Sequence, residues 1–195
     1  MFSLSTPYNI LCALTPCLIY MFITRKQTSK KIKILIVIFT LYLWQVYNVT
    51  GIGGLSDLLY IPDGSEKKII MATINISPLI NIGKDFILNI IMFIPFGYLV
   101  PFIWKDYQKL FKTIVLSFSF SLLIELSQLI TTRAVDINDL IANTLGGIIG
   151  YTIWKLNPLK LKNASKKSPI IYIILSFLGI FFLYYPFTFY KIIGC

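Results

Sequence analysis

The sequence contains no histidine, only eight acidic residues and only three cysteines among its 195 residues. Without histidine, the chain lacks the commonest general base and the commonest zinc ligand of proteins. The cysteines, Cys12, Cys17 and Cys195, are odd in number, and two of them lie in one apolar segment. They therefore predict packed thiols rather than a disulfide framework. Catalysis by histidine and a scaffold held by disulfides are both excluded.

Charge is scarce along the whole chain. Charged residues make up 13% of the sequence and hydrophobic residues 56%, with a mean hydropathy of +0.77. A soluble domain carries about 25% charged and about 45–50% apolar residues. The composition predicts an integral membrane protein, and the length fits a single domain.

Six apolar segments are predicted to cross the membrane as helices, with polar or basic loops between them. They are Tyr8–Ile23, Ile34–Tyr47 (continuing toward Leu55), Phe86–Trp104, Thr113–Ile130, Asp139–Trp154 and Pro169–Phe189. The predicted fold class is all-α, a polytopic membrane helical bundle; a five-helix alternative requires Met1–Thr24 to be peripheral or removed. A further apolar run, Ile69–Ile82, is interrupted by Asn75 and Pro78. We expect it to be interfacial or re-entrant.

Positive charge follows the loops in a regular way. The loops after the first, third and fifth segments hold 5 + 3 + 5 = 13 of the 18 Lys and Arg residues. Because basic loops stay in the cytoplasm, this split predicts a multi-pass protein of the cell membrane with both termini external. The net charge of +10 is then mainly an orientation signal and a contact with anionic lipid, so no nucleic-acid partner is expected.

The fourth predicted helix carries a polar stripe. Side chains three or four residues apart share one helix face, and this face holds Ser117, Ser121, Glu125, Gln128 and Thr132. Lipid cannot satisfy these groups, so they must face other helices or a water-filled cavity. The simpler interpretation is hydrogen bonding between helices. Glu125 is the exception, because a carboxylate inside the membrane is costly without a partner.

A second set of polar residues follows on the fifth helix and its approach. Asp136 or Asp139 is predicted to cap that helix, and Gly146 and Gly150 to let another helix approach closely. Arg133 lies in the short connection between the two helices, and Asn89 lies on the third helix. We predict that Glu125 and Arg133 belong to one network with Asp136 or Asp139. The candidate ligand-binding residues are therefore Asn89, Glu125, Gln128, Arg133, Asp136, Asp139 and Asn143; no catalytic residue, cofactor or metal site is assigned.

The same stretches resemble the VanZ-like family of bacterial membrane proteins. The matching pieces are Asn89-Ile-Ile-Met-Phe-Ile-Pro-Phe-Gly97, Ser121-Leu-Leu-Ile-Glu125-Leu-Ser-Gln128 and Arg133-Ala-Val-Asp136-Ile-Asn-Asp139-Leu-Ile-Ala-Asn143, with Asn75-Ile-Ser-Pro78 similar to the family's Asn-x-x-Pro element. The resemblance implies a helical protein of the bacterial envelope, and the family's namesake is associated with low-level resistance to teicoplanin, a lipid-bearing glycopeptide. We expect a VanZ-like domain at 33–155, an extra N-terminal helix and basic cytoplasmic loop at 1–32, and a basic loop and C-terminal helix at 156–195.

Three functions remain open at this point. The first is binding or modulation of an amphiphilic ligand, either a lipid headgroup or a lipoglycopeptide, at the outer leaflet, with Arg133 pairing its phosphate or carboxylate. The second is an intramembrane enzyme acting on a lipid-linked substrate, with Glu125 as base and Asp136, Asp139 and Asn143 as oxygen ligands of a divalent cation. The third is a structural role in which the polar cluster only specifies helix packing. Membrane lipids are expected partners in every case.

Overall fold

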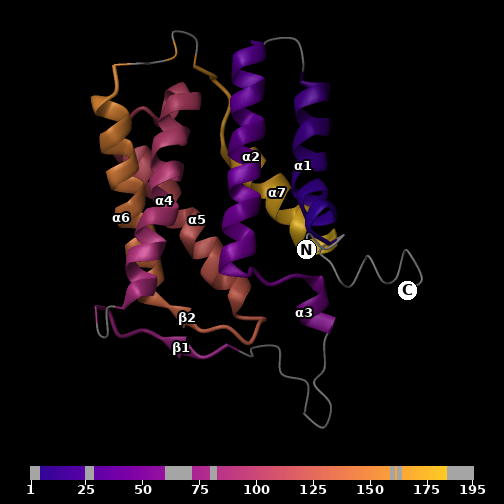
Figure 1. The fold of residues 1–195 in the computed structure, drawn as a ribbon, viewed down its shortest axis with the longest axis vertical. Coiled ribbons are helices and arrows are strands. Elements are labelled where there is room, and N and C mark those ends of the chain that lie inside the picture. Colours follow the sequence, from indigo (N-terminus) through magenta and orange to yellow (C-terminus); the bar gives the residue numbers. More distant parts are fainter. Residues whose placement is uncertain are drawn as a thin grey trace, which may run out of the picture. The chain divides into compact units, whose positions relative to one another are not determined.

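A computed structural model describes residues 5–24, 29–59, 72–79, 83–158, 161 and 164–183 (Figure 1). Its elements in chain order are α1 (Ser5–Ile23), α2 (Lys30–Thr50), α3 (Leu55–Leu59), β1 (Ile74–Asn75), α4 (Lys84–Ile103), a 3₁₀ turn (Lys105–Tyr107), α5 (Leu110–Gln128), β2 (Val135–Asp136), α6 (Ile137–Leu156) and α7 (Ile170–Leu183). Apart from the short β1–β2 pairing, all of these elements are helical, which confirms the all-α fold class.

Four helices in the described part of the chain are long and apolar enough to cross a membrane: α1, α2, α4 and α5. The equally long α6 is more polar, since Asn138, Asp139 and Asn143 lie in its first two turns. Helix α7 is very apolar but has 14 described residues. The part of the predicted segment Pro169–Phe189 that follows Leu183 lies outside the described residues.

The chain forms two compact units. The first contains Met1–Thr73, Ser127–Ala134 and Ile170–Cys195, and the second contains Ile74–Leu126 and Val135–Pro169. The first unit therefore includes α1, α2, α3, α7 and the connection after α5. The second includes α4, most of α5, α6 and both strands.

In the first unit, α1 packs against α7 and α2. The backbone of α1 comes so close to Gly179 on α7 that a Cβ there would meet the carbonyl oxygen of Cys12. The thiol of Cys12 donates to the carbonyl of Leu183, and the thiol of Cys17 to that of Tyr172. Both thiols are free and buried, as expected from their apolar segment.

In the second unit, α4 and α6 make the most extensive contact between helices. Glycines on both helices allow the contact, because a Cβ on Gly97 would meet the backbone of Gly147, and one on Gly150 would meet the backbone of α4. The predicted close approach through Gly146 and Gly150 is thus confirmed. The phenyl rings of Phe93, Phe96 and Phe120 pack together between α4 and α5.

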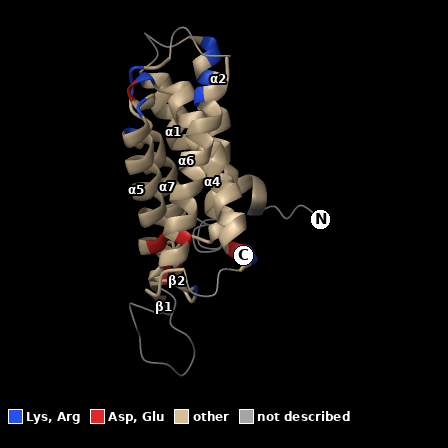
Figure 2. Ribbon diagram, turned by 90° about the vertical axis from the view of Figure 1, so that its left-hand side faces the viewer, with Lys and Arg blue, Asp and Glu red and all other residues tan. Residues whose placement is uncertain are grey.

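Charges separate along the second unit. Figure 2 shows lysines gathered where α4 ends and α5 begins, and most of the acids at the other end, near β1 and β2. The basic end holds Lys105, Lys109, Lys112, Lys155, Lys166 and Lys167 together with Asp106, and the opposite end holds Asp85, Glu125, Asp136 and Asp139 together with Lys84. The orientation prediction requires such a separation, because it places the basic ends of these helices together on the cytoplasmic side.

Two helix ends differ from the sequence expectation. Helix α2 stops at Thr50 and does not continue toward Leu55, because Gly51 adopts φ +60°, a left-handed conformation that ends helices. Helix α5 stops at Gln128 rather than Ile130. There the backbone N–H of Thr131 and its hydroxyl both donate to the carbonyl of Gln128, at 2.9 Å and 2.8 Å, and close a turn.

Candidate functional site

The candidate residues are divided between the two units. Gln128 and Arg133 belong to the first unit. The second unit holds the other five: Asn89, Glu125, Asp136, Asp139 and Asn143. Each group is therefore described within its own unit.

In the second unit, Glu125 lies one turn before the end of α5 and is only 5% exposed. Its Oε2 accepts the backbone N–H of Asp136 at 3.0 Å. The partner that the carboxylate needs is thus a backbone donor from the strand that follows the helix. This bond links the end of α5 to the start of α6 within one unit, through the backbone of Asp136.

Asp136 uses both of its carboxylate oxygens. One accepts the N–H of Asn138 at 2.8 Å, so Asp136 is the N-cap of α6, which confirms one of the two alternatives for the cap. The other accepts the amide of Asn75 at 3.0 Å, across the parallel pairing of β1 with β2. A single side chain therefore caps a helix and joins the two strands.

Asn138 is buried and was missed as a candidate. Its side-chain oxygen accepts the N–H of Leu79 at 2.6 Å, and its amide donates to the carbonyl of Ser77. Leu79 has φ +57°, the one described non-glycine residue with a positive φ. Asn75 was also outside the candidate list, although the Asn-x-x-Pro resemblance pointed to it. Nothing in the local sequence marked Asn138 beyond its position between two acids.

Asn89 and Asp139 form a second polar contact at this end of the unit. Asn89 on α4 lies near the carboxylate of Asp139 on α6, and Asp136 and Asp85 are the acids that act on the same carboxylate. Among the described residues, no group of three or more Cys, Asp or Glu is arranged to hold a metal ion.

Deeper in the unit, the polar stripe of α5 faces α6. Asn143 donates to the hydroxyl of Ser121 at 2.9 Å, and both side chains are almost fully buried. Ser117 is also fully buried and lies where a Cβ on Gly147 would be. The stripe thus faces a neighbouring helix as predicted, and this part of it acts as a link between helices.

In the first unit, Gln128 and Arg133 cap the end of α2. The amide of Gln128 donates to the carbonyl of Thr50 at 2.7 Å, and Nη1 of Arg133 donates to that of Val49 at 3.3 Å. The last carbonyls of a helix have no partner within it, and its C-terminus attracts positive charge. Both side chains therefore stabilise this helix end, a role that the sequence did not indicate. The network joining Arg133 to the acids stays a prediction.

The guanidinium of Arg133 rests directly on Gly51. A Cβ at Gly51 would come within 2.5–2.8 Å of Nε, Cζ and Nη2 of that arginine. The side chain is nevertheless exposed to solvent. Glycine at this position thus serves two purposes, since it allows the left-handed turn and makes room for the arginine.

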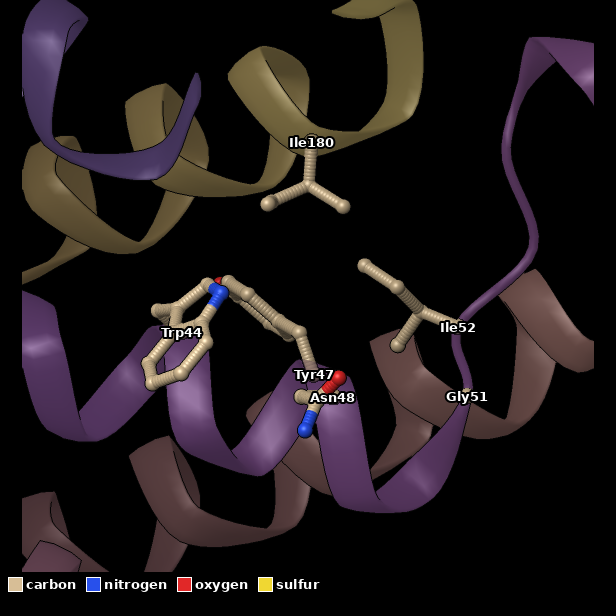
Figure 3. A pocket seen from close by; sticks show the side chains of 6 residues that line it. All are labelled: Trp44, Tyr47, Asn48, Gly51, Ile52 and Ile180. Carbon is tan, nitrogen blue, oxygen red and sulfur yellow. The ribbon is translucent and has the colours of Figure 1, made fainter. Parts of the chain in front are cut away.

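A small cavity lies beside the same helix end (Figure 3). It measures about 20 Å³, enough for a water molecule or a methyl-sized group. Its lining combines aromatic, aliphatic and amide groups: Trp44, Tyr47, Asn48, Gly51, Ile52 and Ile180. Gly51 therefore lines the cavity and also supports the guanidinium.

The bond between Glu125 and the backbone of Asp136 leads to a test. Glu125→Gln keeps an oxygen that can accept this N–H, so membrane abundance should stay near the parent level. Glu125→Ala leaves the N–H of a half-buried backbone group unpaired and should lower stability by about 1–3 kcal/mol. Quantitative immunoblotting of membranes and a thermal melt in detergent measure both effects. Equal melting temperatures for the two variants would show that this bond contributes nothing.

Comparison with known proteins supplies the identity of the chain. Protein VanZ of Enterococcus faecium is 30% identical over 106 residues, which make up 52% of this chain and 64% of that protein. The chain thus spans less than two thirds of that relative's length. No solved structure matches the sequence. The family model for VanZ/LLP1 matches residues 17–158. This range covers most of the chain and all of the candidate residues, and the chain therefore belongs to the VanZ/LLP1 family.

Proposed function

We propose that this member of the VanZ/LLP1 family binds an anionic amphiphile at the outer face of the bacterial membrane, with Arg133 as the headgroup contact. The observation that carries the proposal is the exposure and hydrogen bonding of the Arg133 guanidinium. It is exposed, is held in place by Val49 and Gly51, and donates to the protein through Nη1. A guanidinium has five N–H donors in a planar fork that fits phosphate or carboxylate, so donors remain for a ligand.

The position of this group suits a membrane ligand. Arg133 lies at the end of α2 opposite its basic beginning, where Lys30, Lys31 and Lys33 are located. Because the basic ends are expected to be cytoplasmic, the arginine should meet the headgroups of the outer leaflet. A guanidinium at that level attracts anionic headgroups.

The cavity beside Gly51 supports an amphiphilic rather than a purely polar ligand. Trp44, Tyr47 and Ile52 line it together with Gly51, the residue on which the guanidinium rests. The cavity admits a methyl-sized group, so it would anchor one part of an apolar chain. Lipoglycopeptides such as teicoplanin combine polar groups with a lipid chain. We therefore propose that the protein also binds lipoglycopeptides and that it contributes to teicoplanin resistance.

Ligand binding is tested directly with the purified protein in detergent. A short-chain phosphatidylglycerol should raise the melting temperature in a saturable way, whereas the matching phosphatidylcholine should have little effect. Arg133→Gln should remove the difference between the two lipids. Equal shifts with both lipids, or a shift that survives in Arg133→Gln, would contradict the proposal.

Orientation has its own test, since the proposal requires the end with Arg133 to face outward. In a Cys195→Ser background, Ser77→Cys should react in intact cells with a membrane-impermeant maleimide, and Lys112→Cys should react only after lysis. Both positions are exposed in the structure. The reversed pattern would place the arginine in the cytoplasm and defeat the proposal.

A further inference from the structure

The segment around β1 has an apolar face that no helix of its unit covers. Ile74, Ile76 and Leu79 are 58%, 75% and 57% exposed, although they lie among polar groups at the acidic end of the second unit. In an extended chain, successive side chains point to opposite sides. Ile74 and Ile76 therefore project to one side, and Asn75 projects to the other, where it reaches Asp136. Leu79 follows in a turn, where this alternation no longer applies, and is exposed as well.

Several bonds hold this exposed face in place. The parallel pairing joins Ile74 to Val135 and Asn75 to Asp136, and the Asn138 side chain binds both Ser77 and Leu79. The N–H of Ser77 donates to the side chain of Asn75 at 3.1 Å, which closes a local turn. The apolar side chains are thus displayed by an ordered backbone.

The segment is followed along the chain by a surface that a membrane must cover. Helix α4 begins five residues after Leu79, and its first two turns expose Ile87, Leu88 and Ile91, each by more than half. Helix α4 is long and apolar enough to cross the membrane, and these three side chains lie on one side of it. An apolar face next to the lipid-facing start of a membrane helix favours lipid over water as its neighbour.

We propose that residues 74–79 rest in the interfacial layer of the bilayer, with Ile74, Ile76 and Leu79 in contact with lipid acyl chains. The polar side of the segment then holds Asp136, and through it the start of α6. The segment therefore connects the surrounding lipid to the residues that cap α6. This inference does not depend on the anionic ligand proposed for Arg133, which belongs to the other unit.

The test uses an environment-sensitive fluorophore on single cysteines. Ile76→Cys and Ser77→Cys are made in the Cys195→Ser background, where the remaining thiols of Cys12 and Cys17 are buried. Both variants are labelled with a nitrobenzoxadiazole probe and reconstituted into phosphatidylcholine–phosphatidylglycerol vesicles. Lipids carrying a doxyl group near the headgroup should quench the probe at position 76 at least twice as strongly as at position 77. Aqueous iodide should show the opposite order.

Ile74→Cys repeats the measurement on the same face if the Ile76 variant does not fold, and a thermal melt checks all three variants. Equal quenching by doxyl lipid at positions 76 and 77, with iodide reaching both, would overturn the proposal. Protection of position 76 from both quenchers that disappears as the protein is diluted in lipid would assign the face to a second copy of the chain. That result would also overturn it.

Discussion

Replacing Gly150 with leucine should prevent the folded protein from accumulating in the membrane. A Cβ at this position would meet the carbonyl of Ile94 and the backbone of Gly97 and Tyr98 on α4. Backbone atoms cannot turn aside as a side chain can, so α4 and α6 would have to separate. Overpacking of this kind costs about 3 kcal/mol or more, a large part of the stability of a small protein. Gly150→Ala should lower the melting temperature and retain some folded protein.

Thr152→Leu is the matched control, because Thr152 lies two residues further on the same helix and is exposed. The enlarged side chain there would face outward and should leave abundance unchanged. Fluorescence-detected size-exclusion chromatography of tagged variants measures the folded fraction. If Gly150→Leu and Thr152→Leu gave the same peak, the close contact between α4 and α6 would be wrong.

Arg133→Lys should weaken the binding of phosphatidylglycerol about tenfold, equivalent to ~1.4 kcal/mol. Lysine keeps the charge and can still donate to the carbonyl of Val49, so the cap of α2 and the melting temperature should change little. It loses the planar fork that binds phosphate through two parallel bonds. Titration of the melting temperature with lipid measures the change in affinity. An unchanged affinity would mean that the lipid is bound by the positive charge alone and not by the planar fork.

Substitution of Gly51 tests whether this glycine positions the arginine, because the charge of Arg133 stays unchanged. Gly51→Asn tolerates the left-handed backbone better than Gly51→Ala does, and both place a Cβ against the guanidinium. Both variants should therefore lose lipid binding, whereas only the alanine variant should lose about 1–2 kcal/mol of stability. If Gly51→Asn bound lipid as the parent does, Gly51 would not position the arginine.

The helices could be predicted from the sequence because hydropathy and loop charge are local signals. The runs Phe86–Trp104 and Thr113–Ile130 appear in the structure within a few residues as α4 and α5. The polar stripe of α5 and the close contact at Gly150 followed from helical spacing alone. These features depend on neighbours three or four residues apart, which the sequence displays directly.

The roles of individual polar residues could not be predicted in the same way. Gln128 and Arg133 bind carbonyls 78 and 84 residues earlier in the chain, and no local sequence pattern indicates such distant partners. Asn138 was overlooked for the same reason, since its contacts are with Ser77 and Leu79. An arginine near several acids suggested an ion pair, but backbone carbonyls at a helix end compete for the same donors.

The cap of α2 has a consequence for biosynthesis. Helix α2 is completed long before its capping residues exist, because Gln128 follows Thr50 by 78 residues. At about 5–20 residues per second, translation takes roughly 4–16 s to reach it. During this interval the carbonyls of Val49 and Thr50 have only water or headgroups as partners. The C-terminal end of α2 should therefore mature late, when α5 has entered the membrane, and a nascent chain truncated before Gln128 should be cleaved near Gly51 by added protease.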